Sequence, residues 1–289
     1  MTNDDASVAA KCETVDYGPW ILQGPREKRR KDEAEPALRL FCIPQAGMGA
    51  WAFHGWQKEL GSDIEVMPIE LPGRNSRMRE KRYTSMRELV TAIVDALLGE
   101  FRKYPYAILG HSMGAWIAYE VVHELRRRHE PLPIKLYVSA NRAPHLCAKH
   151  HDVHPVHLHA LPFHDFWEAF WHRYGRSKDL ESEGMRKYVH PMLKDDFTVL
   201  ETYQWNGFRT VTQDSLKHWL KVSALPIPIE AFGAKGDTRY TRDQLSDWSD
   251  HTSVKFNETW FDGKHRYIVD QPEEVRKYVA YDLFGCMAA

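Results

Sequence analysis

The feature that most constrains this chain is a glycine–serine turn between an apolar run and a helical pattern. Residues 106–109 are apolar and lead into Gly110-His111-Ser112-Met113-Gly114, a Gly-x-Ser-x-Gly motif. A serine that joins a strand to a helix holds a strained backbone conformation, and glycine neighbours leave it room. Apolar residues then recur with helical spacing at Ala118, Val121, Val122 and Leu125. The motif therefore predicts a strand, a turn with a nucleophilic serine, Ser112, and a helix.

Composition excludes several classes of protein. The chain has 289 residues, 43% hydrophobic and 27% charged, which suits one large α/β domain with an insertion. A formal net charge of −1 argues against a nucleic-acid partner. The four cysteines are scattered and the first residues are acidic, so we expect a reduced, cytoplasmic protein. No apolar run approaches the roughly 18 residues of a membrane span, so no membrane partner is expected.

Strand and helix patterns alternate along most of the chain. A capping-box spacing at Ser85 and Glu88 predicts the start of one helix, and Asp270-Gln271-Pro272 predicts the start of the last. This alternation predicts an α/β fold with a mostly parallel central sheet covered on both faces. The expected strands are residues 38–43, 64–69, 106–109, 134–138, 227–232 and 254–261.

Two segments fall outside this alternation. Residues 1–36 have little apolar periodicity and carry a basic run, so we expect a charged, flexible N-terminal extension. This extension is either solvated or used for docking or nuclear localisation. Residues 37–289 are expected to form the domain. Between about residues 145 and 225 we expect an inserted helical lid. Its aromatic face either packs against the sheet domain or forms the wall of an acyl pocket. The residues of this face are Phe163, Phe166, Trp167, Phe170, Trp171 and Tyr174.

The serine needs two partners. Its hydroxyl becomes a good nucleophile when a base takes its proton and an acid orients that base. In a strand–turn–helix protein of this kind the chain order is serine, acid, histidine, and catalytic groups follow the carboxyl ends of strands. Asp237 follows residues 227–232 in a glycine turn, and His265 follows residues 254–261 in another. We therefore predict a triad of Ser112, Asp237 and His265.

Other acidic and histidine residues fit these roles less well. Asp243 and Asp247 are placed on the exposed face of a helix, and His251 follows that helix and is expected at the surface. His111, next to the serine, is interpreted as a positioning or packing residue. A group of eight histidines lacks companion cysteines and His-Glu-x-x-His spacing, which favours an exposed loop over a metal site. These are His145, His150, His151, His154, His157, His159, His164 and His172.

Hydrolysis of an acyl compound also needs two donors for the oxyanion. The first is the amide that follows the nucleophile, that of Met113. The second should come from the glycine-containing loop after the first strand, residues 44–50, where Gln45 is the first candidate and Ala46 the next. This chemistry requires no metal and no organic cofactor.

Several ordered motifs continue the pattern over residues 38 to 284. They are Leu40-Phe41-Cys42-Ile43-Pro44-Gln45-Ala46-Gly47, Leu71-Pro72-Gly73-Arg74, Gly110 to Ala115, Val138 to Pro144, the lid residues 161–175, and Gly263-Lys264-His265. Their combination resembles the stand-alone type II thioesterases of polyketide and non-ribosomal peptide synthesis. It is also similar to the medium-chain thioesterase that acts on fatty acid synthase.

The resemblance implies an α/β-hydrolase fold and a serine thioesterase. By matching position, Ser112, Asp237 and His265 are the triad, and Gln45 and Met113 are the oxyanion donors. The implied substrates are acyl groups on the phosphopantetheine arm of acyl carrier or peptidyl carrier proteins, or acyl-CoA. A carboxylesterase or acyltransferase with the same triad remains an alternative, as does a non-catalytic module that binds acyl ligands or synthase subunits.

A basic segment follows the second expected strand. Carrier proteins are typically acidic, so this segment is either a docking patch near the entrance or a solvated loop. Its residues are Arg74, Arg77, Arg79, Lys81 and Arg82.

Overall fold

A single parallel sheet forms the centre of the molecule. The computed structural model describes residues 13–24, 27–205 and 213–288. Within these residues the strand order is β2-β1-β3-β4-β5-β6, and each neighbouring pair is parallel. All of the expected strands are present, so the predicted α/β fold is confirmed. Their bounds are Leu38–Ile43 (β1), Ile64–Pro68 (β2), Tyr106–His111 (β3), Lys135–Ser139 (β4), Ile229–Ala234 (β5) and Phe256–Phe261 (β6).

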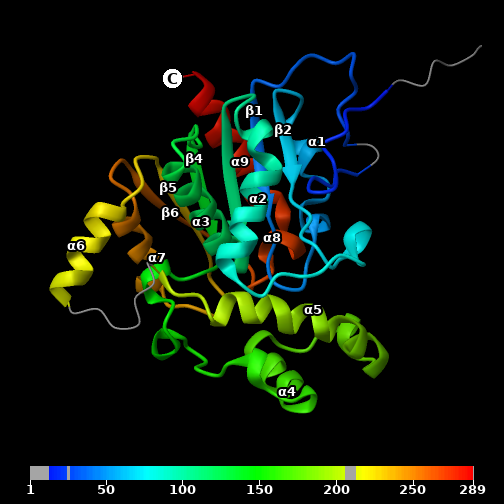
Figure 1. Ribbon diagram of the computed structural model, residues 1–289, viewed down its shortest axis with the longest axis vertical. Coiled ribbons are helices and arrows are strands. Elements are labelled where there is room, and N and C mark those ends of the chain that lie inside the picture. Colours follow the sequence, from blue (N-terminus) through cyan, green and yellow to red (C-terminus); the bar gives the residue numbers. More distant parts are fainter. Residues whose placement is uncertain (1–12, 25–26, 206–212, 289) are drawn as a thin grey trace, which may run out of the picture.

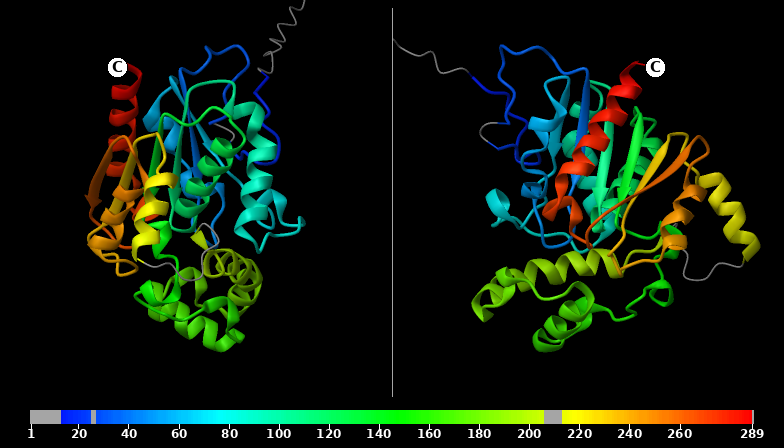
Figure 2. Two further views of the ribbon diagram at one scale, coloured as in Figure 1. Left: turned by 60° about the vertical axis from the view of Figure 1, so that its left-hand side comes forward. Right: turned by 180° about the vertical axis from the view of Figure 1, so that it is seen from behind.

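Helices cover both faces of this sheet. Helices α2 and α3 pack together on one face, whereas α1 and α9 pack on the other (Figures 1 and 2). Burial on both faces explains why the strands are near-continuous apolar runs rather than alternating ones. The helices around the sheet are Trp56–Leu60 (α1), Met86–Phe101 (α2), Met113–Arg127 (α3), Arg242–Ser246 (α7), Tyr267–Asp270 (α8) and Pro272–Ala288 (α9).

The start of α2 matches its sequence signal in part. Ser85 is the N-cap, and its hydroxyl accepts a hydrogen bond from the Glu88 amide. The reciprocal pair of hydrogen bonds that defines a capping box forms instead at the start of α7, between Thr241 and Gln244.

The segment inserted between β4 and β5 contains α4 (Phe163–Tyr174), α5 (Glu183–Glu201) and α6 (Gln213–Ser223). Helices α4 and α5 form the lid, whereas α6 packs against the sheet domain (Figure 1). Helices α4 and α5 lie across the end of the sheet where the strands finish, below the sheet in Figure 1. The aromatic face of α4 packs mainly against α5 and not against the sheet domain, because two amphipathic helices bury their apolar faces against each other. The lid therefore has its own small core, made of Leu158, Phe166, Trp167, Leu193 and Phe197.

Hydrogen bonds to Asp196 tie α5 to the sheet domain. The buried Asp196 carboxylate accepts from the Arg74 guanidinium at 2.7 Å and from the Gly47 amide at 2.8 Å. Gly47 belongs to the loop that follows β1. The lid is thus joined to a loop at the end of the sheet, close to the predicted site.

Part of the N-terminal segment lies against the edge strand β2. Ile21 forms an antiparallel bridge with Ile69, and the Gln23 side chain donates to the Val66 carbonyl at 2.9 Å. The Tyr17 hydroxyl donates to a buried carboxylate of the same strand. These contacts cover an edge that parallel sheets otherwise leave open for pairing. Residues 1–12 and 25–26 lie outside the described residues, and the boundary at residue 36 stays a prediction.

Candidate active site

Ser112 occupies the turn between β3 and α3. Its φ of 54° and ψ of −115° are strained for a non-glycine residue. A Cβ at Gly110 would lie 2.0 Å from the Gly114 carbonyl oxygen, and one at Gly114 would lie 2.2 Å from the Ile43 carbonyl oxygen. Both glycines are therefore needed for close backbone approach. The Asn141 side-chain amide donates to the Ser112 carbonyl at 2.9 Å and helps to hold the turn.

Three side chains that are far apart in the sequence meet in one hydrogen-bonded line. Ser112 Oγ lies 2.9 Å from His265 Nε2, and His265 Nδ1 lies 2.8 Å from Asp237 Oδ2. Asp237 follows β5 and His265 follows β6. Both residues therefore lie at the carboxyl ends of the parallel strands, where the turn after β3 carries Ser112. The structure thus brings together the three residues that the sequence selects.

The environment of Asp237 favours its charged form. Burial alone would raise the pKa of this carboxyl. The charge and the hydrogen bond of His265 act in the opposite direction and, with the other contacts, outweigh burial, so the pKa lies below its ordinary value. The Arg239 amide also donates to Asp237 Oδ1 at 3.0 Å. An ionised carboxylate at Nδ1 keeps a proton on that nitrogen and leaves Nε2 as an acceptor facing the serine.

The two residues predicted to supply oxyanion amides both lie near Ser112. Met113 is the first residue of α3, and Gln45 follows β1 and lines the same cavity as Ser112. Neither amide donates a hydrogen bond to another group in the described part of the chain. Ala46 lines this cavity as well. The assignment of Gln45 and Met113 as oxyanion donors stays a prediction.

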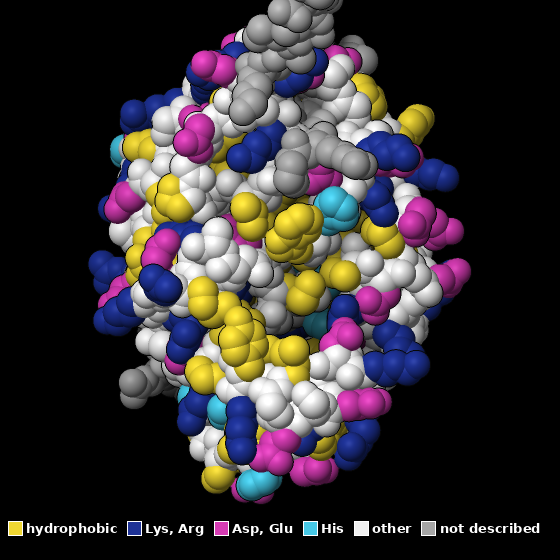
Figure 3. Space-filling model, turned by 90° about the vertical axis from the view of Figure 1, so that its right-hand side faces the viewer, with side chains coloured by type: hydrophobic (Ala, Val, Ile, Leu, Met, Phe, Trp, Pro, Cys, Tyr) yellow, Lys and Arg dark blue, Asp and Glu magenta, His cyan; other side chains and the backbone are white. Residues whose placement is uncertain are grey.

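Ser112 lies at the junction of two cavities. The larger has a volume of about 340 Å³, opens to the surface and is mostly apolar. Phe170 of α4 and Leu193 and Phe197 of α5 form part of its wall. On the face of the molecule shown in Figure 3, apolar side chains surround a hollow. The aromatic face of α4 thus packs within the lid, whereas packing against the sheet domain was one of the two expectations, and it contributes Phe170 and Tyr174 to the wall of this cavity.

The second cavity is smaller and polar. Its volume is about 30 Å³, and it lies between the loop after β4 and the lid. Tyr174, the last residue of α4, lines both cavities together with Ser112 and His265. The Tyr174 and His265 rings are 5.2 Å apart between centroids, so the tyrosine covers the imidazole.

His111 holds the backbone of His265. His111 Nε2 lies 3.0 Å from the His265 carbonyl oxygen, which can only accept, so Nε2 carries the proton. Nδ1 must then accept from the Ser139 hydroxyl at 2.7 Å, and Ser139 in turn accepts from the Tyr267 hydroxyl at 2.5 Å. Burial lowers the pKa of His111 to about 3, which keeps the ring neutral. Sequence reasoning missed Ser139 and Tyr267; the position of Ser139 at the carboxyl end of an expected strand was the available signal.

We expect His111→Phe to lower kcat for a thioester by about 10- to 100-fold, because a small displacement of a catalytic base is costly. The fold should be retained, as phenylalanine fills the buried space. His111→Gln keeps an N–H donor and should recover part of the loss. Steady-state kinetics from pH 5 to 9 test this, and equal loss in both variants would argue against a positioning role.

The structure corrects the placement of His251. This residue was expected at the surface but is fully buried. Its Nδ1 lies 2.9 Å from the Tyr119 hydroxyl oxygen and its Nε2 lies 2.8 Å from His145 Nδ1. The short helical turn that carries it packs onto α3, a contact that local periodicity does not reveal.

The predicted basic patch is wrong as a five-residue docking surface. Arg74 is buried against Asp196, and Arg77 is buried with its guanidinium 4.0 Å from the Trp20 ring centroid. Arg82 pairs with Asp195 at 2.6 Å. The two remaining members, Arg79 and Lys81, are exposed.

No group of three or more histidine, cysteine or acidic residues is arranged to hold a metal ion within residues 13–24, 27–205 and 213–288. Cys42, Cys147 and Cys286 are free thiols, and Cys12 lies outside the described residues. In this described part of the chain, none of the helices combines the length and apolar character that crossing a bilayer requires.

A parallel sheet, a helical lid and a serine at the strand–helix turn define the α/β-hydrolase class. Residues 38–281 match the family model described as a thioesterase domain, and the chain belongs to this family. It is therefore a thioester hydrolase, as the sequence motifs predict.

Individual relatives cover most of the chain. It is 31% identical over 248 residues to gramicidin S biosynthesis protein GrsT of Aneurinibacillus migulanus, and this match covers 85% of this chain and 89% of that protein. It is 30% identical over 263 residues to thioesterase PikA5 of Streptomyces venezuelae, spanning 90% of this chain and 84% of that protein. The solved structure of the RedJ thioesterase from the prodiginine biosynthetic pathway in Streptomyces coelicolor superimposes with a TM-score of 0.73 and 32% identity, covering 86% of this chain and 93% of that one.

Proposed function

We propose that this thioesterase releases acyl groups from the phosphopantetheine thiol of acyl carrier or peptidyl carrier proteins, or from acyl-CoA. It would act as an editing or release enzyme of a polyketide, non-ribosomal peptide or fatty acid synthase. The hydrogen-bonded line of Ser112, His265 and Asp237 beside an open apolar cavity carries this proposal. The biosynthetic names of the similar proteins GrsT and RedJ support the synthase context.

In the proposed mechanism, His265 Nε2 takes the proton of Ser112 as Oγ attacks the thioester carbonyl carbon. The amides of Gln45 and Met113 stabilise the negative oxygen of the tetrahedral intermediate. The carbon–sulfur bond then breaks, and the thiol leaves with the proton from His265. Water loses a proton to the same histidine and attacks the acyl-serine ester. The bond from the acyl carbon to Ser112 Oγ then breaks, His265 returns the proton to Oγ, and the carboxylic acid is freed. Asp237 stabilises the imidazolium in both halves of the reaction.

A substrate panel separates this function from an esterase. Acyl-CoA, the acyl-N-acetylcysteamine thioester and an oxygen ester of the same acid are compared by kcat/KM. We expect the thioesters to be preferred at least about tenfold, because the open cavity of about 340 Å³ offers contacts to a pantetheine-like arm that a simple ester lacks. Equal or faster cleavage of the oxygen ester would favour the carboxylesterase alternative.

An active-site label tests the non-catalytic alternative. A fluorophosphonate reacts only with a serine that an adjacent base activates. We expect it to modify Ser112, detected by mass spectrometry of the labelled peptide. An unreactive Ser112 in a folded protein would support a binding module instead.

A further inference from the structure

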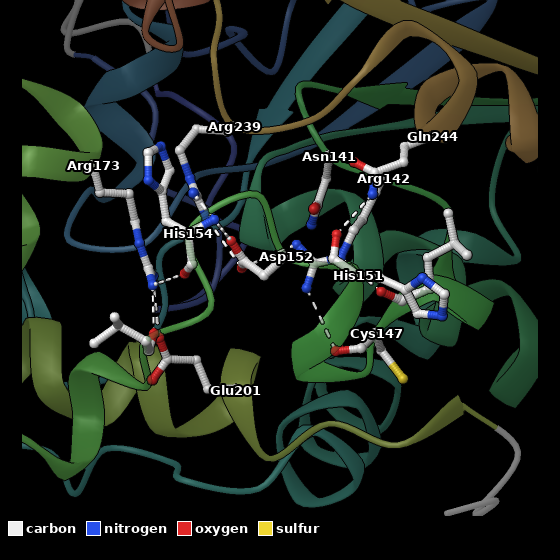
Figure 4. Close-up of polar contacts among 12 residues, drawn as sticks. Asn141, Arg142, Cys147, His151, Asp152, His154, Arg173, Glu201, Arg239 and Gln244 are labelled. Atoms are coloured by element: carbon white, nitrogen blue, oxygen red, sulfur yellow. Dashed lines mark hydrogen bonds and ion pairs between the residues drawn. The ribbon is translucent and has the colours of Figure 1, made fainter. Parts of the chain in front are cut away.

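The small cavity beside Ser112 carries charges that thioester hydrolysis does not itself require. Three buried arginines, Arg142, Arg173 and Arg239, line it, together with the carboxylates of Asp152 and Glu201 (Figure 4). These side chains come from the loop after β4, from α4 and α5, and from the loop after β5. A group bound in this cavity would therefore meet a strongly polar wall on one side of the nucleophile.

The positive charge in this cavity is not balanced. Arg173 pairs with Glu201 at 3.1 Å, but Arg142 and Arg239 share one carboxylate. Asp152 Oδ2 lies 3.2 Å from Arg142 Nη1 and 3.2 Å from Arg239 Nη2. Arg142 and Arg239 are each only 7% exposed. The cluster of Arg142, Asp152 and Arg239 thus holds one buried positive charge in excess.

Among the described residues that line the cavity, no further carboxylate offsets this excess. Asp237 is the nearest candidate in the sequence, but its Oδ2 contacts His265 and it is not part of the cavity wall. The remaining cation of the wall, Lys149, is exposed and adds to the positive charge. A buried charge without a counter-ion is costly, so the cavity is a favourable place for an anionic group.

The two cavities suggest which half of the substrate each one takes. A pantetheine arm must reach Ser112 from the solvent, which requires the open cavity of about 340 Å³. With the arm in the open cavity, the cavity of about 30 Å³ on the other side of Ser112 is left for the acyl group. One water needs roughly 10–15 Å³ by the same measure, so the smaller cavity accommodates only a few heavy atoms.

Tyr174 links this cavity to the catalytic histidine. Its ring centroid lies 5.2 Å from that of His265 and 5.3 Å from the Arg239 guanidinium carbon. The imidazole and the guanidinium therefore both contact this one ring. Arg239 and Ser112 also line the same small cavity, so a group attached to the acyl carbonyl enters the surroundings of the guanidinium.

We propose, resting on the function proposed above, that the small cavity selects short acyl groups that end in a carboxylate, such as a malonyl group. Arg239 supplies the main contact, because Asp152 and Tyr174 are its side-chain partners and the planar guanidinium matches a carboxylate. Arg142 is held in place by the carbonyls of Leu146 and Cys147 and contributes charge more than contact.

A pair of substrates of equal shape tests the proposal. In isovaleryl-CoA an isopropyl group replaces the carboxylate of malonyl-CoA. We expect the wild-type enzyme to prefer malonyl-CoA by at least about tenfold in kcat/KM. The ratio of the two kcat/KM values is the readout, since a general loss of activity cancels from it.

Two variants should move this ratio in opposite directions. Arg239→Met removes the excess charge and leaves Asp152 paired with Arg142, so the preference for malonyl-CoA should fall at least about tenfold. Asp152→Asn increases the positive charge and should raise the preference. Arg176→Met is the matched control: it removes an exposed arginine that stacks on Trp171 and does not line the cavity, and should leave the ratio unchanged.

The outcomes separate this proposal from the proposed function. Hydrolysis of isovaleryl-CoA equal to or faster than that of malonyl-CoA by the wild type overturns the carboxylate preference alone, whether or not the variants fold. A ratio that stays constant in both cavity variants also overturns it, because the arginines then only brace the lid. Absence of hydrolysis of either compound, and of every thioester in the panel above, overturns the proposed function itself.

Discussion

Ser112→Ala is expected to lower kcat for any thioester substrate by at least about 10³-fold, because the hydroxyl is the atom that forms the acyl-enzyme. The Oγ atom contacts His265 Nε2, and alanine keeps the Cβ that the turn already accommodates. Substrate binding should therefore survive the change. Steady-state kinetics on the wild type and the variant give the loss, and calorimetry with an unhydrolysed acyl-CoA gives the affinity.

The urea concentration at the midpoint of unfolding, compared between the wild type and Ser112→Ala, shows whether the variant is folded. Since one buried hydroxyl hydrogen bond is lost, the free energy of unfolding should change by no more than about 1 kcal/mol. A variant that retained a tenth or more of wild-type kcat would show that another group attacks the thioester, and the proposed mechanism would be wrong.

Asp237→Asn should cost about 10⁴-fold in kcat, although the new side chain has nearly the same shape. An amide that donates to Nδ1 of His265 leaves the proton on Nε2, where it can no longer accept the serine proton. The variant also loses the negative charge that stabilises the imidazolium. Single-turnover measurements should show that acylation of Ser112 is the slowed step.

Asp243→Asn provides the matched control for Asp237→Asn. Asp243 lies exposed on α7, six residues further along the chain, so its change should leave kcat within about twofold of the wild type. Comparable losses in the two variants would mean that the acid of the triad had been wrongly assigned.

The sheet and the turns that carry its reactive groups were predictable because their signals are local. Parallel strands buried on both faces are continuous apolar runs, and the observed strand ends lie within two residues of most predictions. Glycine turns after three of these strands marked Ser112, Asp237 and His265. The rule that catalytic groups gather at the carboxyl edge of a parallel sheet then placed them together.

The predictions that failed depend on partners that are distant in the sequence. The sequence around Arg74 is typical of a solvated loop. In the structure Arg74 is buried, and its partner Asp196 lies 122 residues away in the sequence. His251 follows a short helix, but its hydrogen bond is to Tyr119 on α3. The hydrogen bonds of His111, whose interpretation as a positioning or packing residue did not fail, also involve partners distant in the sequence. Local composition does not determine which polar side chains become buried when the lid and the sheet domain come together.

The attachment of α5 to the loop after β1 supports a segment beside the nucleophile. The Asp196 carboxylate accepts a hydrogen bond from the Gly47 amide, two residues after Gln45, whose amide is predicted to stabilise the oxyanion. The same carboxylate also accepts from the Arg74 guanidinium, so one buried acidic side chain supports both the seating of α5 and the loop that carries Gln45. Replacing Asp196 with alanine would therefore disturb the lid and the loop beside the nucleophile together.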